Sequence, residues 1–159
     1  AMIQLLCVRP GLIQSNVPGA HGSTKPLGNC LEIGTGCGYQ AALLGHLARR
    51  VVSIERLRDQ HYKARSNLDQ LRAVVPTSPD VRLVYGDGMI GHAPSAPYDT
   101  IIAAAGGAAL PQAWLDPLAP GGRLVAPTQA DIVDRLADGR FQHTRAGAVL
   151  FVPLKSGTT

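Results

Sequence analysis

Short apolar runs alternate with helical runs between residues 30 and 127 of this 159-residue chain, and this alternation constrains the fold most strongly. Each apolar run ends at a glycine, a proline or an acidic residue, a pattern typical of short strands that are buried on both faces. We therefore expect strands at Cys30–Ile33, Val51–Ile54, Val81–Tyr85, Asp99–Ala105 and Arg123–Pro127.

The segments between these runs have helical spacing. Residues 39–48 predict one helix, and apolar positions from Leu57 to Leu71 recur at the period of an amphipathic helix. A third helix is expected to start at Pro111 and to include Leu118, before a turn at residues 120–122. Strands that alternate with helices predict an α/β fold with a doubly wound, mostly parallel sheet.

The two ends of the chain depart from this alternation. Residues 132–136 and 148–152, joined by a turn at 137–140, predict an antiparallel hairpin on the edge of the sheet. The apolar residues between Met2 and Leu6 predict a short helix, followed by a loop rich in Ser, Asn, Pro and Gly. We therefore divide the chain into an N-terminal helix and loop (1–29) and a main domain (30–159).

Composition excludes several classes of protein. The longest apolar stretch, Ile101–Leu110, contains two glycines and is half as long as the roughly 20 residues that a membrane-spanning helix needs. The three cysteines lack paired spacing, and no export signal is recognisable, so we expect reduced thiols in a cytoplasmic protein. The five histidines show no metal-ligand spacing, and no metal site is expected.

The net charge of +4 is concentrated in residues 49–72. A basic helix there could attract nucleic acid or an acidic partner. No aromatic platform interleaves the charges, as single-strand binding would favour. We interpret the segment as a solvated helix face and expect no nucleic-acid partner.

A glycine-rich turn follows the first expected strand, in the sequence LEIGTGCGYQ. Its spacing is GxGxG, unlike the GxGxxG of dinucleotide sites, and Glu32 before it would repel a pyrophosphate. Glu55 ends the second strand, where it can hold a ribose diol, and Asp87 ends the third, where it can reach an adenine edge. Three acidic groups at the carboxyl ends of adjacent strands favour S-adenosylmethionine, which carries a positive sulfonium and no phosphate.

These motifs also carry a family resemblance. LEIGTGCGYQAALL, VVSIER, VYGDG, APYDTIIAAAG, LPQAWLDPLAPGGRLVAP and VLFVPL together resemble the protein-L-isoaspartate O-methyltransferases, over residues 30–127 and again over about 132–154. The resemblance implies a Rossmann-like class I methyltransferase fold and transfer of a methyl group to isoaspartyl or D-aspartyl carboxylates in aged proteins, which initiates their repair. It implies that the cofactor is bound by Glu32, Gly34, Thr35, Gly36, Gly38, Tyr39, Gln40, Glu55, Arg56, Gly86, Asp87, Gly88 and Ala104. It further implies damaged proteins or peptides as partners, with the enzyme acting as a monomer.

The resemblance is incomplete at the N-terminus. The family carries a His-Gly-x-Thr-Ile-Ser-x-Pro segment that positions the substrate carboxylate, and no such string occurs here. Residues 21–26 echo it only partly, so Ser23 and Thr24 are candidates for the substrate loop and the catalytic residues stay unassigned. We expect the chain to omit pieces of a longer protein.

Two alternatives to this function are open from the sequence. One is a module that keeps the cofactor site but lacks the substrate lid and is inactive. The other is a small-molecule or RNA methyltransferase that uses the basic helix at 56–72. The acceptor chemistry favours the carboxylate, because a carboxylate is already an anion at pH 7 and needs no general base.

Overall fold

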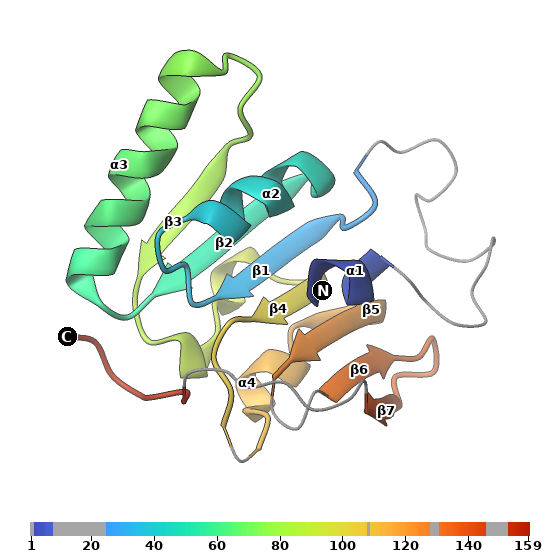
Figure 1. The fold of residues 1–159 in the computed structure, drawn as a ribbon. Coiled ribbons are helices and arrows are strands. Elements are labelled where there is room, and N and C mark those ends of the chain that lie inside the picture. The colour runs from blue at the N-terminus through green and yellow to red at the C-terminus, as the bar shows by residue number, and fades with distance from the viewer. Residues whose placement is uncertain (1, 8–24, 108, 128–130, 146–152) are drawn as a thin grey trace.

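A computed structural model describes residues 2–7, 25–107, 109–127, 131–145 and 153–159. Its centre is a seven-stranded sheet in the order β3-β2-β1-β4-β5-β6-β7, shown in Figure 1. The first five strands pair in parallel, and the last two pair antiparallel. The bounds are β1 Asn29–Ile33, β2 Arg50–Glu55, β3 Val81–Tyr85, β4 Tyr98–Ala103, β5 Leu118–Ala126, β6 Asp131–Arg135 and β7 Phe141–Arg145.

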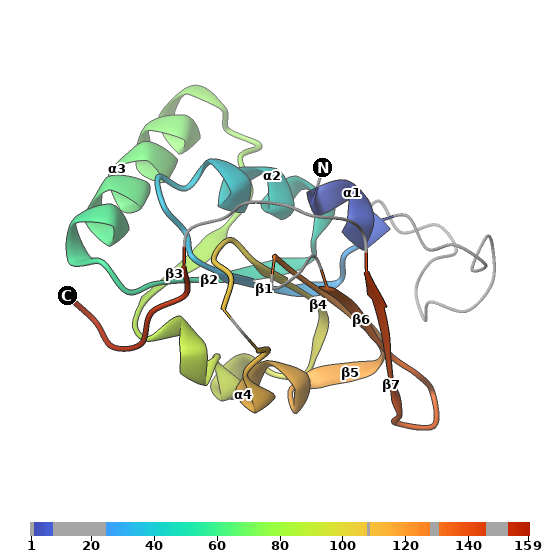
Figure 2. The same cartoon turned by 60° about the horizontal axis from the view of Figure 1, so that its bottom comes forward.

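Helices cover both faces of the sheet, which confirms the doubly wound α/β prediction (Figure 2). One face carries α1 (Met2–Cys7), α2 (Tyr39–Leu47) and α3 (Arg58–Val74). The other carries α4 (Gln112–Leu115) and two single-turn 3-10 helices, η1 (Gly88–Ile90) and η2 (Ala93–Ser95).

Alternation along the strands divides the core into two clusters. In β1 and β2, Cys30 and Val51 belong to the cluster under α1, α2 and α3, whereas Leu31 and Val52 belong to the cluster that contains Trp114. Successive strand residues point to opposite faces, so strands apolar at both sets of positions need cover on both sides. This burial is why the strand runs could be recognised from the sequence.

The strand β5 begins earlier than expected. Leu118 does not extend the helix that follows Pro111, because α4 ends at Leu115 and Leu118 already pairs with Tyr98. The expected turn at 120–122 lies inside β5 as an irregularity, since the next pair is Thr100 with Arg123. Gly121 has φ +78°, a conformation that lets the strand pass this irregularity.

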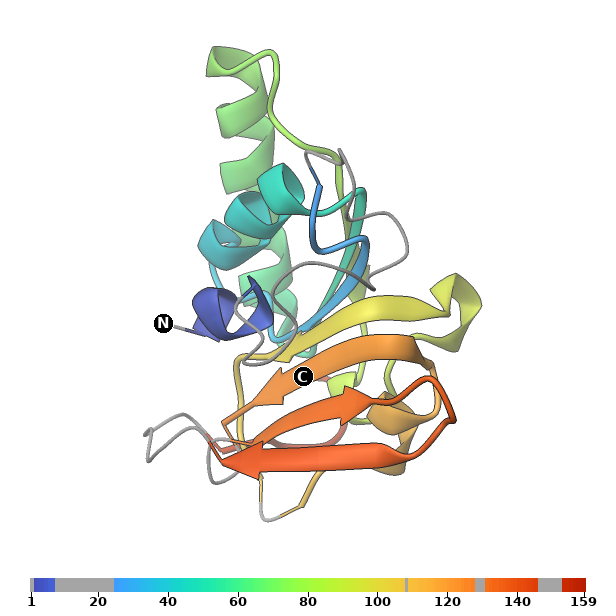
Figure 3. The same ribbon diagram turned by 90° about the vertical axis from the view of Figure 1, so that its right-hand side faces the viewer.

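The predicted antiparallel hairpin is confirmed, but its second strand is Phe141–Arg145 (Figure 3). The strand expected at 148–152 lies outside the described residues. The structure thus corrects the second strand of the predicted hairpin. The prediction relied on apolar content, whereas β7 is the outer strand and four of its five residues are exposed. An edge strand of this kind needs no apolar pattern.

The N-terminal helix α1 is confirmed and packs on β5 and β4, with Leu6 buried in the core. Arg123 connects it to the sheet: its guanidinium donates to both carboxylate oxygens of Asp134 at 2.7 Å and to the Leu5 carbonyl oxygen at 2.8 Å. The loop expected over residues 12–29 is described only from residue 25. Within the described ranges, no helix has the length and apolarity needed to cross a membrane.

Candidate functional site

The glycine turn after β1 has the backbone that its sequence requires. Gly34, Gly36 and Gly38 have φ values of +91°, +56° and +88°, which residues other than glycine rarely adopt. Gly34 N donates to the Ile54 carbonyl oxygen at 2.9 Å, so the turn is bonded to the end of β2. Gly38 then precedes α2. The turn therefore brings backbone close to whatever lies above the carboxyl ends of β1 and β2.

Glu55 bonds this turn to the start of α3. The residue is 6% exposed; its Oε2 accepts a hydrogen bond from Gly36 N and its Oε1 accepts one from Leu57 N, both at 2.9 Å. Two backbone donors fix the orientation of the side chain, and each oxygen keeps a lone pair for a further donor. The position fits the expectation that Glu55 faces a ligand at the end of β2.

Glu32 lies behind the turn. It is fully buried, and its carboxylate accepts hydrogen bonds from Gln40 Nε2 at 3.0 Å and Ser53 Oγ at 2.5 Å. Ser53 Oγ also lies 2.6 Å from Thr35 Oγ1. Burial, together with the charge of Glu55, raises the pKa of the Glu32 carboxyl to about 7, although the bonds from Ser53 and Gln40 lower it. The network of Glu32, Thr35, Gln40 and Ser53 thus supports the turn from below.

Asp87 follows the end of β3 and orders the next turn. Gly86 N donates to the Glu55 carbonyl oxygen at 3.0 Å, which holds the two strand ends together. Asp87 Oδ1 accepts from Met89 N at 2.9 Å and caps η1. Asp87 Oδ2 accepts from Gly157 N at 2.7 Å, a contact across 70 residues. The Asp87 carboxylate therefore already has a donor at each oxygen.

A cavity of about 550 Å³ lies at this end of the sheet. Six of the residues predicted to bind the cofactor line it: Gly34, Gly36, Glu55, Arg56, Gly88 and Ala104. Thr35 and Glu32 are buried behind it, and Tyr39 is 71% exposed. Gly38, Gln40, Gly86 and Asp87 are near it in the chain but are not part of its lining. Ser23 and Thr24 lie outside the described residues.

The lining also includes residues that the sequence did not assign to the site. These are Ile33, Ile54, Leu57, Gln60, Ala105, Pro153, Leu154 and Lys155. The string VLFVPL signalled the family but not the place of its last residues. Pro153 bridges Gly106, and Leu154 N donates to the Gly106 carbonyl oxygen at 2.6 Å, which brings the C-terminal segment to the end of β4.

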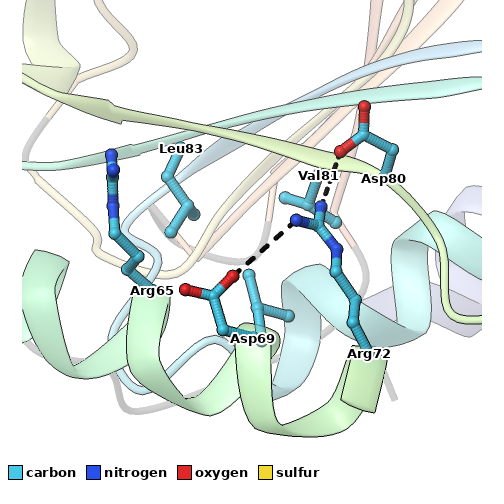
Figure 4. Close-up of a pocket in the computed structure, with 7 residues that line it drawn as sticks. Arg65, Asp69, Arg72, Asp80, Val81 and Leu83 are labelled. Atoms are coloured by element: carbon cyan, nitrogen blue, oxygen red, sulfur yellow. Dashed lines mark hydrogen bonds and ion pairs between the residues drawn. The ribbon is translucent and has the colours of Figure 1, made fainter. Parts of the chain in front are cut away.

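A second, smaller cavity of about 220 Å³ lies between α3 and β3 (Figure 4). Arg72 occupies one side and pairs with Asp80 at 2.6 Å and with Asp69 at 3.8 Å. The cavity is near the beginning of β3, at the opposite end of that strand from Asp87. Its charged groups neutralise one another, so it lacks the convergence of strand ends that marks the first cavity as the candidate site.

The lining of this site combines the Glu55 carboxylate and glycine backbone with two cationic side chains, Arg56 and Lys155. Among the described residues that line it there is no histidine or cysteine, and the described ranges contain no cluster of three potential metal ligands. The groups present can bind, orient and exclude water from a ligand.

Comparison with known sequences identifies relatives of the chain. The sequence profile of the protein-L-isoaspartate(D-aspartate) O-methyltransferase family matches residues 23–159. The protein-L-isoaspartate O-methyltransferase of Methylibium petroleiphilum is 59% identical over 136 residues, covering 80% of this chain and 49% of that protein. Its counterpart in Leptothrix cholodnii is 53% identical over 157 residues, covering 94% of this chain and 52% of that protein. The chain thus spans about half the length of the curated relatives it matches.

Comparison with solved structures supports the fold. A Plasmodium falciparum protein-L-isoaspartate O-methyltransferase in complex with S-adenosyl-L-homocysteine superposes with a TM-score of 0.69 at 19% identity, over 83% of this chain and 67% of that one. At this identity the likeness concerns the fold alone. The profile match over residues 23–159, with relatives that are 53–59% identical over most of this chain, shows that the chain belongs to the protein-L-isoaspartate(D-aspartate) O-methyltransferase family.

Proposed function

We propose that the chain binds S-adenosylmethionine and transfers its methyl group to the carboxylate of L-isoaspartyl or D-aspartyl residues in damaged proteins. The observation that carries the proposal is the convergence of the glycine turn and Glu55 on one cavity, with Asp87 beside it. Ligands of open α/β sheets bind at the carboxyl ends of the strands. Family membership supports the choice of cofactor and acceptor.

The residues present fit this cofactor. The cavity of about 550 Å³ is within the range of small-molecule sites. The Glu55 oxygens, each with one backbone donor, can accept further bonds from ribose hydroxyls. We assign cofactor binding to Gly34, Gly36, Glu55, Arg56, Gly88 and Ala104 in the lining, and to Glu32, Thr35, Gly38, Tyr39, Gln40, Gly86 and Asp87 around it.

Bound S-adenosylmethionine supplies a methyl group activated by a positively charged sulfur. An isoaspartyl carboxylate is already ionised at neutral pH, so no residue of the chain has to remove a proton from it. The absence of histidine and cysteine from the described lining is consistent with such an acceptor. The chain's own contribution is to align the two reactants and to exclude water. This alignment accelerates the reaction because it raises the effective concentration of one reactant at the other.

The proposal includes the organisation and surroundings of the protein. Residues 30–159 form the cofactor-binding unit, and residues 1–29 are an N-terminal helix and loop that precede it. Damaged proteins or peptides are the partners, and the enzyme works as a monomer in the cytoplasm. Sedimentation analysis tests the monomer, because a stable dimer would double the mass of 16.7 kDa.

Methyl labelling tests the activity. An isoaspartyl peptide and its aspartyl twin are incubated with the protein and labelled S-adenosylmethionine. We expect base-labile label on the isoaspartyl peptide only. Equal labelling of both peptides would exclude the proposed acceptor. Calorimetric binding of S-adenosyl-L-homocysteine tests the cofactor separately, because it needs no substrate loop.

A further inference from the structure

The C-terminal segment 153–159 crosses the candidate site and bonds to its far side. Figure 1 shows it running beneath the strand ends and finishing beside the start of α3. Its first residues are anchored at Gly106, and Pro153, Leu154 and Lys155 form part of the cavity lining. Its last residues bond to the segment that follows Glu55.

Four hydrogen bonds hold the outer part of this segment. Gly157 N donates to Asp87 Oδ2 at 2.7 Å, and Arg56 Nε donates to the Gly157 carbonyl oxygen at 2.9 Å. Thr159 N donates to the Arg56 carbonyl oxygen at 3.0 Å, and Arg58 N donates to the Thr159 carbonyl oxygen at 2.7 Å. The donors and acceptors on the tail are all main-chain groups, so the contact depends on the path of the tail rather than on its side chains.

We propose that residues 156–159 are a strap that occupies the adenine side of the cofactor site and is displaced when the cofactor binds. The inference rests on the proposed function. A purine amino group and the Gly157 N–H are both hydrogen-bond donors, and both would use the Asp87 carboxylate. Asp87 Oδ1 accepts from Met89 N and Oδ2 accepts from Gly157 N, so the tail already takes one of the acceptor positions of this carboxylate. The strap also holds Arg56, which lines the cavity.

Displacing the strap from its closed position costs little free energy. Residues 155–159 are exposed, so little apolar surface is buried by the closed position. Exposed hydrogen bonds exchange for bonds to water at small net cost. The anchor at Gly106 stays in place when the outer residues leave, because Leu154 holds it through a separate bond. Release therefore opens the adenine side without detaching the wall of the cavity.

Removing the strap should tighten cofactor binding. The apparent dissociation constant of a site that must open first is the intrinsic constant divided by the open fraction. A strap closed in about nine molecules of ten thus weakens binding about tenfold. Gly157→Pro removes the N–H and cannot adopt the φ of +75° at this position. Deletion of residues 157–159 removes the same contact by another route, and Thr158→Ala, which keeps the backbone, is the matched control.

The experiment measures calorimetric binding of S-adenosyl-L-homocysteine and amide hydrogen exchange on the full chain. We expect both strap variants to bind about tenfold more tightly than the parent and Thr158→Ala to bind like it. In the parent, the ligand should slow exchange at Gly36 and accelerate it at Gly157 and Thr159.

Two results would overturn the strap. If the ligand protects Gly36 but leaves the Gly157 amide slow, and the variants bind no more tightly, the strap is wrong and the cofactor proposal stands. If no variant binds the ligand and no amide responds, the cofactor proposal fails and the strap fails with it.

Discussion

The indole Nε1 of Trp114 donates a 2.7 Å hydrogen bond to the carbonyl oxygen of Gly88. The bond joins α4 to η1, and Trp114 is fully buried. Gly88 lines the cavity and follows Asp87 directly. One core side chain on the face opposite α2 and α3 therefore holds the turn that presents the Asp87 carboxylate.

We expect Trp114→Phe to destabilise the fold and loosen this turn. The Gly88 carbonyl keeps a bond from Gly91 N at 3.1 Å, so the loss comes from the missing indole donor and the space it leaves. The free energy of unfolding should fall by about 1–3 kcal/mol in urea titration. Tyr62→Phe, at a side chain that is 62% exposed, should stay within about 0.5 kcal/mol of the parent. Equal effects of the two substitutions would contradict this role for Trp114.

Glu55→Gln should weaken binding of S-adenosyl-L-homocysteine. In glutamine an NH2 group replaces one carboxylate oxygen, so in the same rotamer it faces one of the two donors, Gly36 N or Leu57 N, and the side chain has no charge to strengthen bonds to ribose hydroxyls. Hydrogen bonds to charged groups contribute roughly 1.5–3 kcal/mol, which corresponds to a roughly 10- to 150-fold higher dissociation constant by calorimetry. Asp59→Asn removes the same charge from an exposed position on α3 and should leave the constant unchanged. Parallel losses in both variants would point to a general charge effect instead.

The buried carboxyl of Glu32 should make stability depend on pH. Its pKa is raised from 4.5 to about 7, so between these values the folded chain keeps a proton that the unfolded chain loses. The Glu32 contribution therefore lowers stability as pH rises from about 4.5 to 7 and is absent below that window. Glu32→Gln lacks this dependence and should gain roughly 3 kcal/mol on the parent by pH 8, measured by urea unfolding at each pH. A difference that is flat across the window would refute the assignment.

Asp134→Ala should be one of the most destabilising single substitutions in the described part of the chain. It leaves the Arg123 guanidinium, whose side chain is 4% exposed, without its carboxylate. Because the Asp134 side chain is 22% exposed and the Leu5 carbonyl oxygen still accepts from Arg123, the cost should lie below the roughly 3–5 kcal/mol of breaking a fully buried pair. The exposed pair of Asp138 and Arg140 is the matched control, and Asp138→Ala should change stability far less than Asp134→Ala does. Thermal unfolding of the two variants distinguishes an ion pair between β5 and β6 that is largely withdrawn from solvent from a surface contact.

The sequence by itself determined the parallel part of the fold and the glycine turn. The strands β1, β2 and β4 are buried on both faces, so their apolar runs show in the sequence, and α3 follows the spacing of His61, Ala64 and Leu68. The positive φ values at Gly34, Gly36 and Gly38 explain why three glycines stand at alternate positions. These features depend on residues that are close together in the sequence, so the sequence alone is enough to predict them.

Only the tertiary structure decided where β7 lies, which acids face the cavity and what crosses it. The outer strand Phe141–Arg145 has no apolar signal, because its pairing depends on backbone bonds to β6. Glu32 and Glu55 look alike in the sequence, yet Ser53 and Gln40 hold one behind the turn while the other lines the cavity. The bond from Gly157 to Asp87 spans 70 residues. Contacts of this range depend on how the whole chain packs, and no local pattern encodes them.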